Sequence, residues 1–275
     1  MPLHPRLYLG TQSWSHKSWE EVFYPEGAAP GDYLAYYATR FRAVEVDATF
    51  YRIPSESMTK RWARALPDGF RFSAKVPQVI THEKTLENCG EELRLFLGAM
   101  DHLGDKLGPI LFQFPYFNKK SGMTGEIFND RLRKFLPQLP EGYRFALEIR
   151  NKAWLNPAFL GLLRDHGVAY TLVDHPWMPR IGEVMDNLDP ATADFAYVRW
   201  LGDRRGIEKK TTSWEKLIVD RSREMEAWVP ALRDLLGRNM TIYGFFNNHY
   251  AGHAPGSIAL LEQALGEGGG GAGGS

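Results

Sequence analysis

The sequence is poor in features that would place it in several large protein classes. It has one cysteine, Cys89, which excludes an intrachain disulfide and indicates a reducing compartment. No apolar run approaches the roughly 20 residues of a membrane-spanning helix. The N-terminal MPLHPRLYLG lacks the apolar core and the cleavage signature of a signal peptide. These absences predict a cytoplasmic protein without a membrane partner.

An excess of charge of one sign is also missing. Lys and Arg together number 33, and so do Asp and Glu, so no net field attracts nucleic acid or an anionic membrane. A nucleic-acid partner is therefore not favoured. The segments GDRRG and GIEKKTTSW nevertheless place a local group of basic residues after residue 200, which keeps that alternative open.

Several catalytic motifs are absent as well. The first apolar run leads into GTQSWSHKSW, which has neither the GxGxxG of a dinucleotide-binding loop nor a P-loop. The chain has no HExxH, no paired-histidine spacing and no cysteine set for a metal. It also has no GxSxG, and Cys89 lies away from any expected strand end. Nucleophilic acyl chemistry is therefore not expected.

What the sequence does contain is an alternation of short apolar runs and longer segments with helical spacing. The expected strands cover 6–12, 43–49, 70–75, 109–114, 144–150, 169–174, 195–200 and 241–246, and the expected helices cover 30–40, 57–65, 91–103, 129–136, 156–165 and 213–236. This order predicts parallel strands with crossover helices. Eight repeats match a single (β/α)₈ TIM barrel, for which about 250 residues are typical. A doubly wound open sheet is the alternative.

The chain divides into one domain and a short tail. No linker or shift in composition interrupts residues 1–265, which are expected to form the barrel. The tail 266–275, GEGGGGAGGS, has no side chains with which to bury itself and is expected to be disordered.

Polar side chains follow nearly every expected strand. They include Glu45, Asp47, Thr49, Ser73, Lys75, Gln113, Glu148, Arg150, Asp174, Tyr197, Arg199, Asn247 and Asn248. In a parallel barrel these strand ends meet at one mouth, where ligands bind. Burying a charged group costs free energy unless the group is paired or takes part in binding or catalysis. This convergence therefore predicts a pocket. Some of the charges are expected to be structural ion pairs, such as Glu148 with Arg150 or Asp174 with Lys75.

The residue types at this mouth favour an anion site with acid–base groups. The expected substrate-binding residues are Arg150, Arg199, Gln113, Asn247, Asn248, His249, Glu45 and, for stacking, Trp14. Glu148 or Asp174 is the expected general base, and Lys75 or His82 the acid or charge stabiliser. No cofactor is certain. A divalent metal, Mg²⁺ or Mn²⁺, held by the carboxylates with His82, His175 or His249 is an open alternative.

Seven segments occur in an order that resembles the YecE-like family, also called domain of unknown function family 72. They are GTQSWSHKSWEEVFYP, VEVDATFYRIPS, WARALPDGFRFSAKVPQVITH, LGDKLGPILFQFP, ALEIRNKAW, YVRW and FNNHYAGHAP. The resemblance covers nearly the whole chain and implies a TIM barrel, but it supplies no reaction. The chain departs from the family pattern at Leu201, where a histidine is expected, at Ser13, where glycine is common, and at Ser257, where asparagine is common. A mechanism that requires that histidine is in doubt here.

Three classes of function follow from these features. The first is an enzyme, such as an isomerase, lyase or hydrolase, acting on a phosphorylated or otherwise anionic small molecule. The second is a metal-dependent phosphodiesterase or nuclease-like enzyme. The third is a binding module that senses an anionic metabolite without turnover. Added salt separates them, because nucleic-acid affinity falls steeply with salt and affinity for a small ligand does not.

Overall fold

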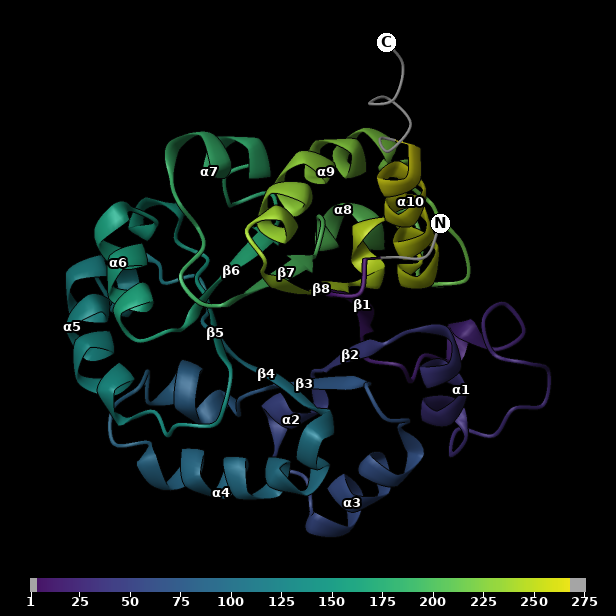
Figure 1. Ribbon diagram of the computed structural model, residues 1–275, viewed down its shortest axis with the longest axis horizontal. Coiled ribbons are helices and arrows are strands. Elements are labelled where there is room, and N and C mark those ends of the chain that lie inside the picture. The colour runs from purple at the N-terminus through teal and green to yellow at the C-terminus, as the bar shows by residue number, and fades with distance from the viewer. Residues whose placement is uncertain (1–3, 268–275) are drawn as a thin grey trace.

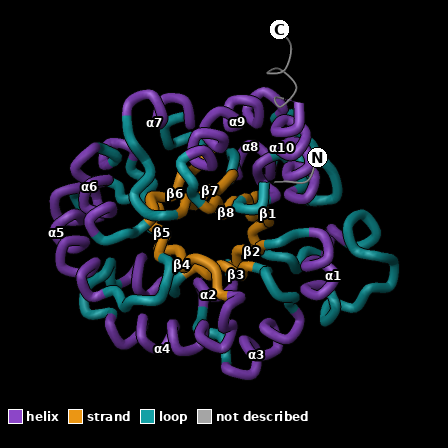
Figure 2. The backbone as a smooth tube through the Cα atoms, viewed as in Figure 1, coloured by secondary structure: helices purple, strands orange, loops and turns teal. Residues whose placement is uncertain are grey.

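Eight parallel strands close into a barrel, as the sequence predicts. The computed structural model describes residues 4–267. The strands are β1 (Leu7–Gln12), β2 (Ala43–Val46), β3 (Arg71–Lys75), β4 (Leu107–Gln113), β5 (Phe145–Glu148), β6 (Ala169–Asp174), β7 (Phe195–Trp200) and β8 (Thr241–Phe246). They pair in sequence order, and β1 closes the ring against β8. Figure 1 and Figure 2 show the strands around a common centre.

Helices surround the strands on the outside. They are α1 (Tyr33–Arg40), α2 (Ala48–Tyr51), α3 (Glu56–Ala65), α4 (Gly90–Met100), α5 (Gly125–Phe135), α6 (Pro157–Asp165), α7 (Ile181–Asn187), α8 (Arg204–Glu208), α9 (Ser222–Gly237) and α10 (Ala254–Glu267). Local capping marks several starts: Thr124 caps α5 and Asn156 caps α6, each accepting a hydrogen bond from a first-turn amide. The alternation of strands and helices makes this a (β/α)₈ TIM barrel.

The helix expected over 213–236 begins nine residues later, at Ser222. The segment before it is held by tertiary hydrogen bonds instead. The amides of Ile218 and Val219 both donate to the carbonyl of Ala251, at 2.7 and 3.1 Å. Those amides are therefore committed to the loop after β8, so the prediction of helix there was wrong.

The strands bury their two faces in different cores. One cluster, on alternate residues of the strands, fills the barrel interior and comprises Ala43, Leu111, Ala146, Ala169, Phe195, Tyr197, Tyr243 and Phe245. The other, larger cluster packs the opposite faces of the strands against the helices, for example Phe72 against Trp62 of α3. This two-residue alternation decides which strand-end side chains reach the mouth and which point toward the helices.

Strand β2 ends three residues earlier than expected, and this relocates two predicted residues. β2 ends at Val46, so Asp47 and Thr49 do not share a strand face with Glu45. Thr49 lies in α2, where its hydroxyl donates to the carbonyls of Val46 and Lys75 and ties β2 to β3. The prediction that Thr49 belongs to the group of polar side chains at the mouth was therefore wrong.

The C-terminal end of the barrel differs slightly from the expected boundary. Helix α10 continues through Glu267, two residues into the segment that was expected to be disordered. The remainder of the predicted disordered tail, residues 268–275, lies outside the described residues. None of the helices in residues 4–267 has the length and apolarity that a membrane span requires.

Candidate functional site

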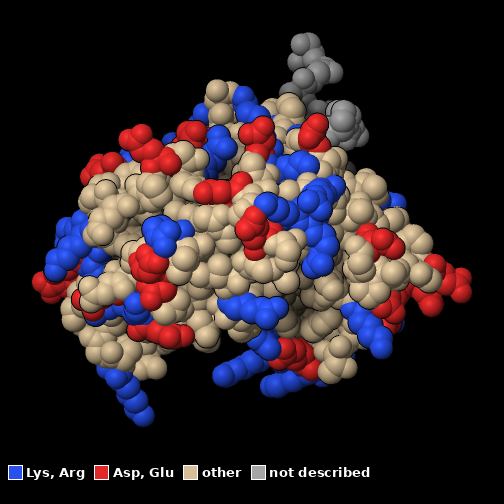
Figure 3. Space-filling view, turned by 90° about the horizontal axis from the view of Figure 1, so that it is seen from below, with Lys and Arg blue, Asp and Glu red and all other residues tan. Residues whose placement is uncertain are grey.

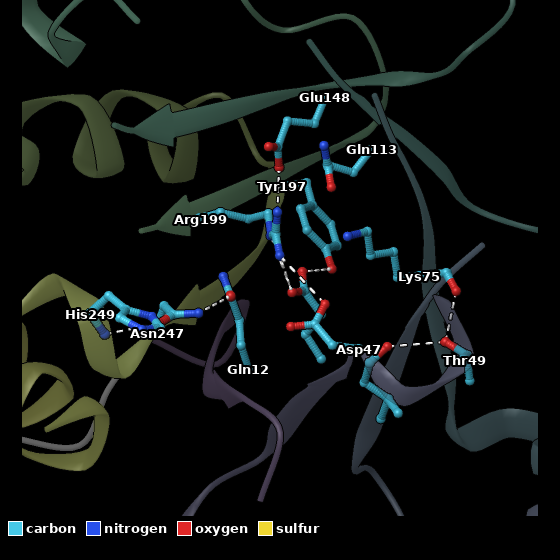
Figure 4. Close-up of polar contacts among 12 residues, drawn as sticks. Gln12, Asp47, Thr49, Lys75, Gln113, Glu148, Tyr197, Arg199, Asn247 and His249 are labelled. Atoms are coloured by element: carbon cyan, nitrogen blue, oxygen red, sulfur yellow. Dashed lines mark hydrogen bonds and ion pairs between the residues drawn. The ribbon is translucent and has the colours of Figure 1, made fainter. Parts of the chain in front are cut away.

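A cavity of about 300 Å³ lies where the C-terminal ends of the strands meet. Its lining includes the predicted residues Lys75, Gln113, Arg150, Arg199, Asn247 and His249. Glu45 and Glu148 lie directly behind Arg199 and contact it. Figure 4 shows these side chains pointing toward one another from β3, β5, β7 and the loop after β8. The strand-end pattern of the sequence thus brings most of its predicted residues to one place.

A larger hollow of about 930 Å³ lies at the opposite end of the barrel. Its lining comes from the loops at the strand starts and includes Asp68, Arg71 and Arg144. Asp68 and Arg144 are exposed, so water already solvates their charges. None of the charged residues that line this hollow is buried, in contrast to Glu45, Glu148 and Arg199 at the mouth.

Arg199 is the centre of a buried ion-pair network. The side chain is only 3% exposed, and its guanidinium lies between two fully buried carboxylates. Nη1 donates to Oε2 of Glu148 at 2.6 Å, and Nη2 donates to Oε1 of Glu45 at 2.7 Å. Burial alone would lower the pKa of Arg199, but Glu148 and Glu45 outweigh burial and raise this pKa well above its ordinary value. Much of the hydrogen-bonding capacity of Arg199 is therefore used inside the protein, which leaves less of it for an anionic ligand.

Glu148 is an ion-paired carboxylate with little basicity. Burial alone would raise its pKa, but Arg150 and Arg199 outweigh burial and lower the pKa of Glu148 to about 2. Arg150 also donates its Nε to Glu148, so the expected Glu148–Arg150 ion pair is confirmed. A carboxylate with so low a pKa is a weak base near neutral pH. The geometry therefore gives Glu148 an organising role and does not favour it as the general base.

Glu45 is held on the other side of Arg199. The hydroxyl of Tyr197 donates to Oε2 of Glu45 at 2.7 Å, and burial raises the pKa of this carboxyl, against the pull of Arg199. Asp47, on the loop that follows β2, lies 3.7 Å from Nη2 of Arg199 and lines the cavity. Oδ1 of Asp47 is buried and has no hydrogen-bond partner in the described chain. The Asp47 side chain is 37% exposed, so its carboxylate is accessible to a ligand, unlike those of Glu45 and Glu148.

Lys75 has an unusual environment for a lysine. The residue is 8% exposed, and its amine lies 3.9 Å from the centre of the Phe50 ring. It forms no ion pair or hydrogen bond through this amine with residues 4–267, and the expected Asp174–Lys75 pair is absent from that range. Burial lowers the pKa of Lys75, while Asp47 opposes the shift. Its position at the mouth agrees with the sequence-based prediction.

His82 lies beside the mouth and not in the lining of the cavity. It belongs to a short π-helical turn, Val79–Glu83, and its ring packs edge-on against Phe50. Burial, with the charges of Lys75 and Arg150, lowers the pKa of His82 to about 4. A histidine with that pKa is neutral near pH 7, so it has no proton to give as an imidazolium. The structure does not favour the expected role of His82 as an acid.

Three other predicted residues serve packing or capping. Asp174 accepts hydrogen bonds from Trp228 of α9 at 3.0 Å and from Tyr250 at 3.1 Å, outside the barrel interior. Trp14 packs against Trp62 and Phe72. Asn248 is buried and accepts from the amide of Ala254, which ties the loop after β8 to the start of α10. Placing these three side chains in the pocket was wrong, because each points toward a helix or a neighbouring turn.

Sequence reasoning also missed residues that do line the mouth. They include Gln12, Phe50, Tyr51 and Arg204, and His175, which the sequence indicated only as a possible metal ligand, lines the cavity as well. Gln12 ends β1 and accepts from Nδ2 of Asn247 at 2.7 Å, and its own Nε2 is buried without a partner in the described chain. Every second residue of a strand faces the same side of the barrel, so counting by two from an interior residue identifies side chains that reach the mouth. From Ala169 on β6, the count selects His175 and passes over Asp174.

The charge of Lys75 should be detectable at His82. We expect Lys75→Met to raise the pKa of His82 above about 4, since that charge is its second-largest depressing influence after burial. Lys75→Arg keeps the charge and should keep the pKa low. A proton NMR titration of the His82 ring measures both variants. Equal His82 titrations in the wild type and Lys75→Met would contradict this electrostatic contact.

The sign of the His82 effect on stability follows from the same shift. The folded-state pKa of His82 lies below the ordinary value of an unfolded histidine. As pH falls below about 6.5, the folded protein therefore binds fewer protons than the unfolded chain. His82 therefore contributes stability that is present above that pH and is lost as pH falls toward 4. Replacing His82 with glutamine should flatten this part of the acid-stability profile, as urea unfolding at each pH would show.

Metal-binding groups are sparse in the described part of the chain. Residues 4–267 contain no group of three or more His, Cys, Asp and Glu side chains arranged to hold an ion. The carboxylates of Glu45 and Glu148 bind arginine donors instead. The alternative of Mg²⁺ or Mn²⁺ at this mouth stays a prediction from the sequence.

Comparison with known proteins assigns the chain to a family. The model of a family described as "Protein of unknown function DUF72" matches residues 8–272. The chain belongs to the DUF72 family. The UPF0759 protein YunF of Bacillus subtilis is 27% identical over 266 residues, which cover 90% of each chain. YecE of Escherichia coli is 29% identical over 145 residues, 53% of this chain and 48% of YecE. The resemblance to the YecE-like family is thereby confirmed.

A solved structure agrees with this assignment. A DUF72 family protein from Thermotoga maritima has a TM-score of 0.69 and 27% identity, and the match covers 94% of this chain and 99% of that one. The family description names no reaction, so the function must be argued from the mouth of this DUF72 barrel. At that mouth Leu201, the residue that departs from the family pattern, is 8% exposed and lines the cavity. The cavity wall is apolar at this position.

Proposed function

We propose that this DUF72 protein is an enzyme that binds a phosphorylated or otherwise anionic small molecule at the mouth of the barrel. The observation that carries the proposal is a set of donors without hydrogen-bond partners in the described chain, all on residues that line one cavity. They are the amine of Lys75, the Nη groups of Arg150 and the buried Nε2 of Gln12. Donors held at the wall of a cavity favour a ligand with acceptors, and a phosphate or carboxylate supplies several.

The carboxylates nearby do not cancel this attraction. Glu45 and Glu148 are already paired with arginine, and Asp47 is the carboxylate that still faces the cavity. The partly exposed carboxylate of Asp47 can accept a hydrogen bond from a donor such as a hydroxyl group. The complementary ligand thus has an anionic group at one end and a hydroxyl near the other.

The size of the cavity supports a metabolite. About 300 Å³ is at the small end of ligand pockets. A neighbouring hollow of about 540 Å³ shares Arg150 with the cavity and is lined by Tyr116, Lys152 and Trp177. Tyr116 and Trp177 are half exposed, and their rings lie edge to face 5.5 Å apart. A ligand longer than one phosphate group would extend across Arg150 toward these rings.

Calorimetry with inorganic phosphate at low ionic strength tests the anion site. Arg150→Met should weaken phosphate binding by roughly 10- to 100-fold, the range expected from losing charge-assisted hydrogen bonds. Arg94→Met is the matched control, because Arg94 is an exposed residue of α4 that pairs with Glu91. Phosphate binding that is absent from the wild type, or unchanged in Arg150→Met, would overturn the proposal.

A second candidate is a phosphodiesterase or nuclease-like activity. It is favoured by α8, where Arg204 lines the cavity and Arg205, Lys209 and Lys210 are exposed nearby. Elsewhere the surface mixes both signs, as Figure 3 shows for the face seen from below. If short nucleic acids are the ligands, affinity should fall steeply between 50 and 200 mM salt, whereas affinity for a small anion should change little. A pocket that binds phosphate esters without turnover would indicate the third candidate, a non-catalytic module.

A further inference from the structure

The amine of Lys75 differs from those of other partly buried lysines in this protein. Lys84 pairs with Glu92 and donates to the carbonyl of Asn88 at 2.8 Å. Lys106 donates to two carbonyls, including that of Ala63 at 2.7 Å. Lys75 has an aromatic face in place of oxygen acceptors. Buried lysines are normally paired, so an unpaired one inside a cavity needs an explanation.

The surroundings of Lys75 shift its amine toward the neutral form, which is the nucleophilic one. Burial and the nearby charge of Arg199 lower the pKa of Lys75, although Asp47, Glu148 and Glu45 act in the opposite direction. An amine with a lowered pKa has an available lone pair in a larger fraction of molecules near neutral pH. Figure 4 shows the side chain reaching from β3 into the space beside Arg199 and Tyr197.

We propose that Lys75 forms an imine with an aldehyde or ketone carbonyl of the ligand. The proposal deepens the proposed function and rests on it, because the anionic end of the same ligand would bind at Arg150. The neutral amine nitrogen bonds to the carbonyl carbon, and the carbonyl oxygen takes one proton from the amine and one from solvent and leaves as water. The product is a C=N bond whose nitrogen carries one hydrogen and one positive charge, so the step needs no oxidant.

The neighbouring groups suit such a step. Asp47 lines the same cavity, and its partly exposed carboxylate can accept the proton that the attacking amine gives up and return it to the departing oxygen. An imine draws electrons from the adjacent carbon, so a C–H or C–C bond there breaks with its electron pair flowing to nitrogen. The site would therefore serve lyase or isomerase chemistry on a phosphorylated ketose or a keto acid.

Borohydride trapping tests the imine directly. The protein is incubated with dihydroxyacetone phosphate and sodium borohydride, which delivers hydride to an imine carbon and makes the bond permanent. Intact mass should show one adduct per chain, and peptide mapping should place it on Lys75. Lys75→Arg and Lys75→Met should lose at least about 90% of the adduct. Lys84→Arg is the matched control and should keep it, because Lys84 is already paired with Glu92.

Neutral dihydroxyacetone, run in parallel, separates this proposal from the anion site. We expect at least tenfold less trapping with the neutral ketone, and a similar loss for the phosphorylated ketone in Arg150→Met. Equal trapping of both ketones at Lys75 would support the imine and count against the anion site. Phosphate binding by calorimetry without any adduct would support the anion site and overturn the imine. Adducts spread equally over Lys75 and the other lysines would also overturn it.

Discussion

Replacing Arg199 with methionine should lower the free energy of unfolding by about 3–5 kcal/mol, the range for breaking a buried ion pair from one side. The guanidinium of Arg199 is 3% exposed and neutralises two carboxylates that have no access to water. Methionine fills much of the volume but leaves Glu45 without a cationic partner, whereas Glu148 keeps Arg150. Urea unfolding of the two proteins measures the difference.

Adding Glu45→Gln to Arg199→Met tests the origin of this loss. If the unpaired carboxylate is responsible, the double variant should recover at least about 1 kcal/mol, the lower end of the cost of a buried unsatisfied group. Arg94→Met, which breaks an exposed pair on α4, should change stability by less than about 1 kcal/mol. An Arg199→Met protein as stable as wild type would refute the central place of this residue in the barrel mouth.

Gly10→Ala should destabilise the barrel by about 3 kcal/mol or more, through overpacking that neither backbone can relieve. A Cβ on Gly10 would lie 1.9 Å from the carbonyl oxygen of Ala43, its partner in the register of β1 and β2. The hydroxyl of Tyr37 occupies the same place, donating to that carbonyl and accepting from the amide of Thr11 at 2.7 Å. The added methyl group must push the two strands apart or displace this bridge.

Gly98→Ala is the matched control for that prediction. Gly98 lies within α4, and a Cβ there has no atom within 4 Å. Alanine favours a helix over glycine, so this variant should be more stable than wild type by about 0.5–1 kcal/mol. Thermal unfolding of both variants measures these changes in stability. A Gly10→Ala protein that unfolds at the same temperature as Gly98→Ala would show that β1 and β2 are not packed as closely as described.

The Arg199→Met and Gly10→Ala variants test the structural framework around the cavity. The variants used for trapping and calorimetry test what the cavity binds. Arg199 and Glu148 are organising residues, because their charges are committed to one another. Lys75 and Arg150 line the cavity and have hydrogen-bond donors that no protein group in the described chain occupies. A variant of the first pair is therefore expected to lose stability and binding together. A variant of the second pair should lose binding or trapping in a folded protein.

The sequence by itself determined the architecture and the end of the barrel where the site lies. Apolar runs such as 169–174 and 241–246 match β6 and β8 residue for residue, because buried parallel strands are continuously apolar. Strand ends in a parallel barrel share one mouth by topology, so charged residues after such runs must converge. That reasoning located Lys75, Arg150 and Arg199 without coordinates.

Only the tertiary structure decided what each polar side chain does at the mouth. Asp174 and His175 are neighbours in sequence, yet the first binds Trp228 of α9 and the second lines the cavity. Arg150 and Arg199 are both cations, yet the guanidinium of Arg199 is occupied by ion pairs with Glu45 and Glu148. Whether a charged side chain is paired, and with which partner, depends on groups that the fold brings together from distant parts of the chain. The pKa of Glu148 is set by such neighbours and by burial, which a linear pattern does not contain.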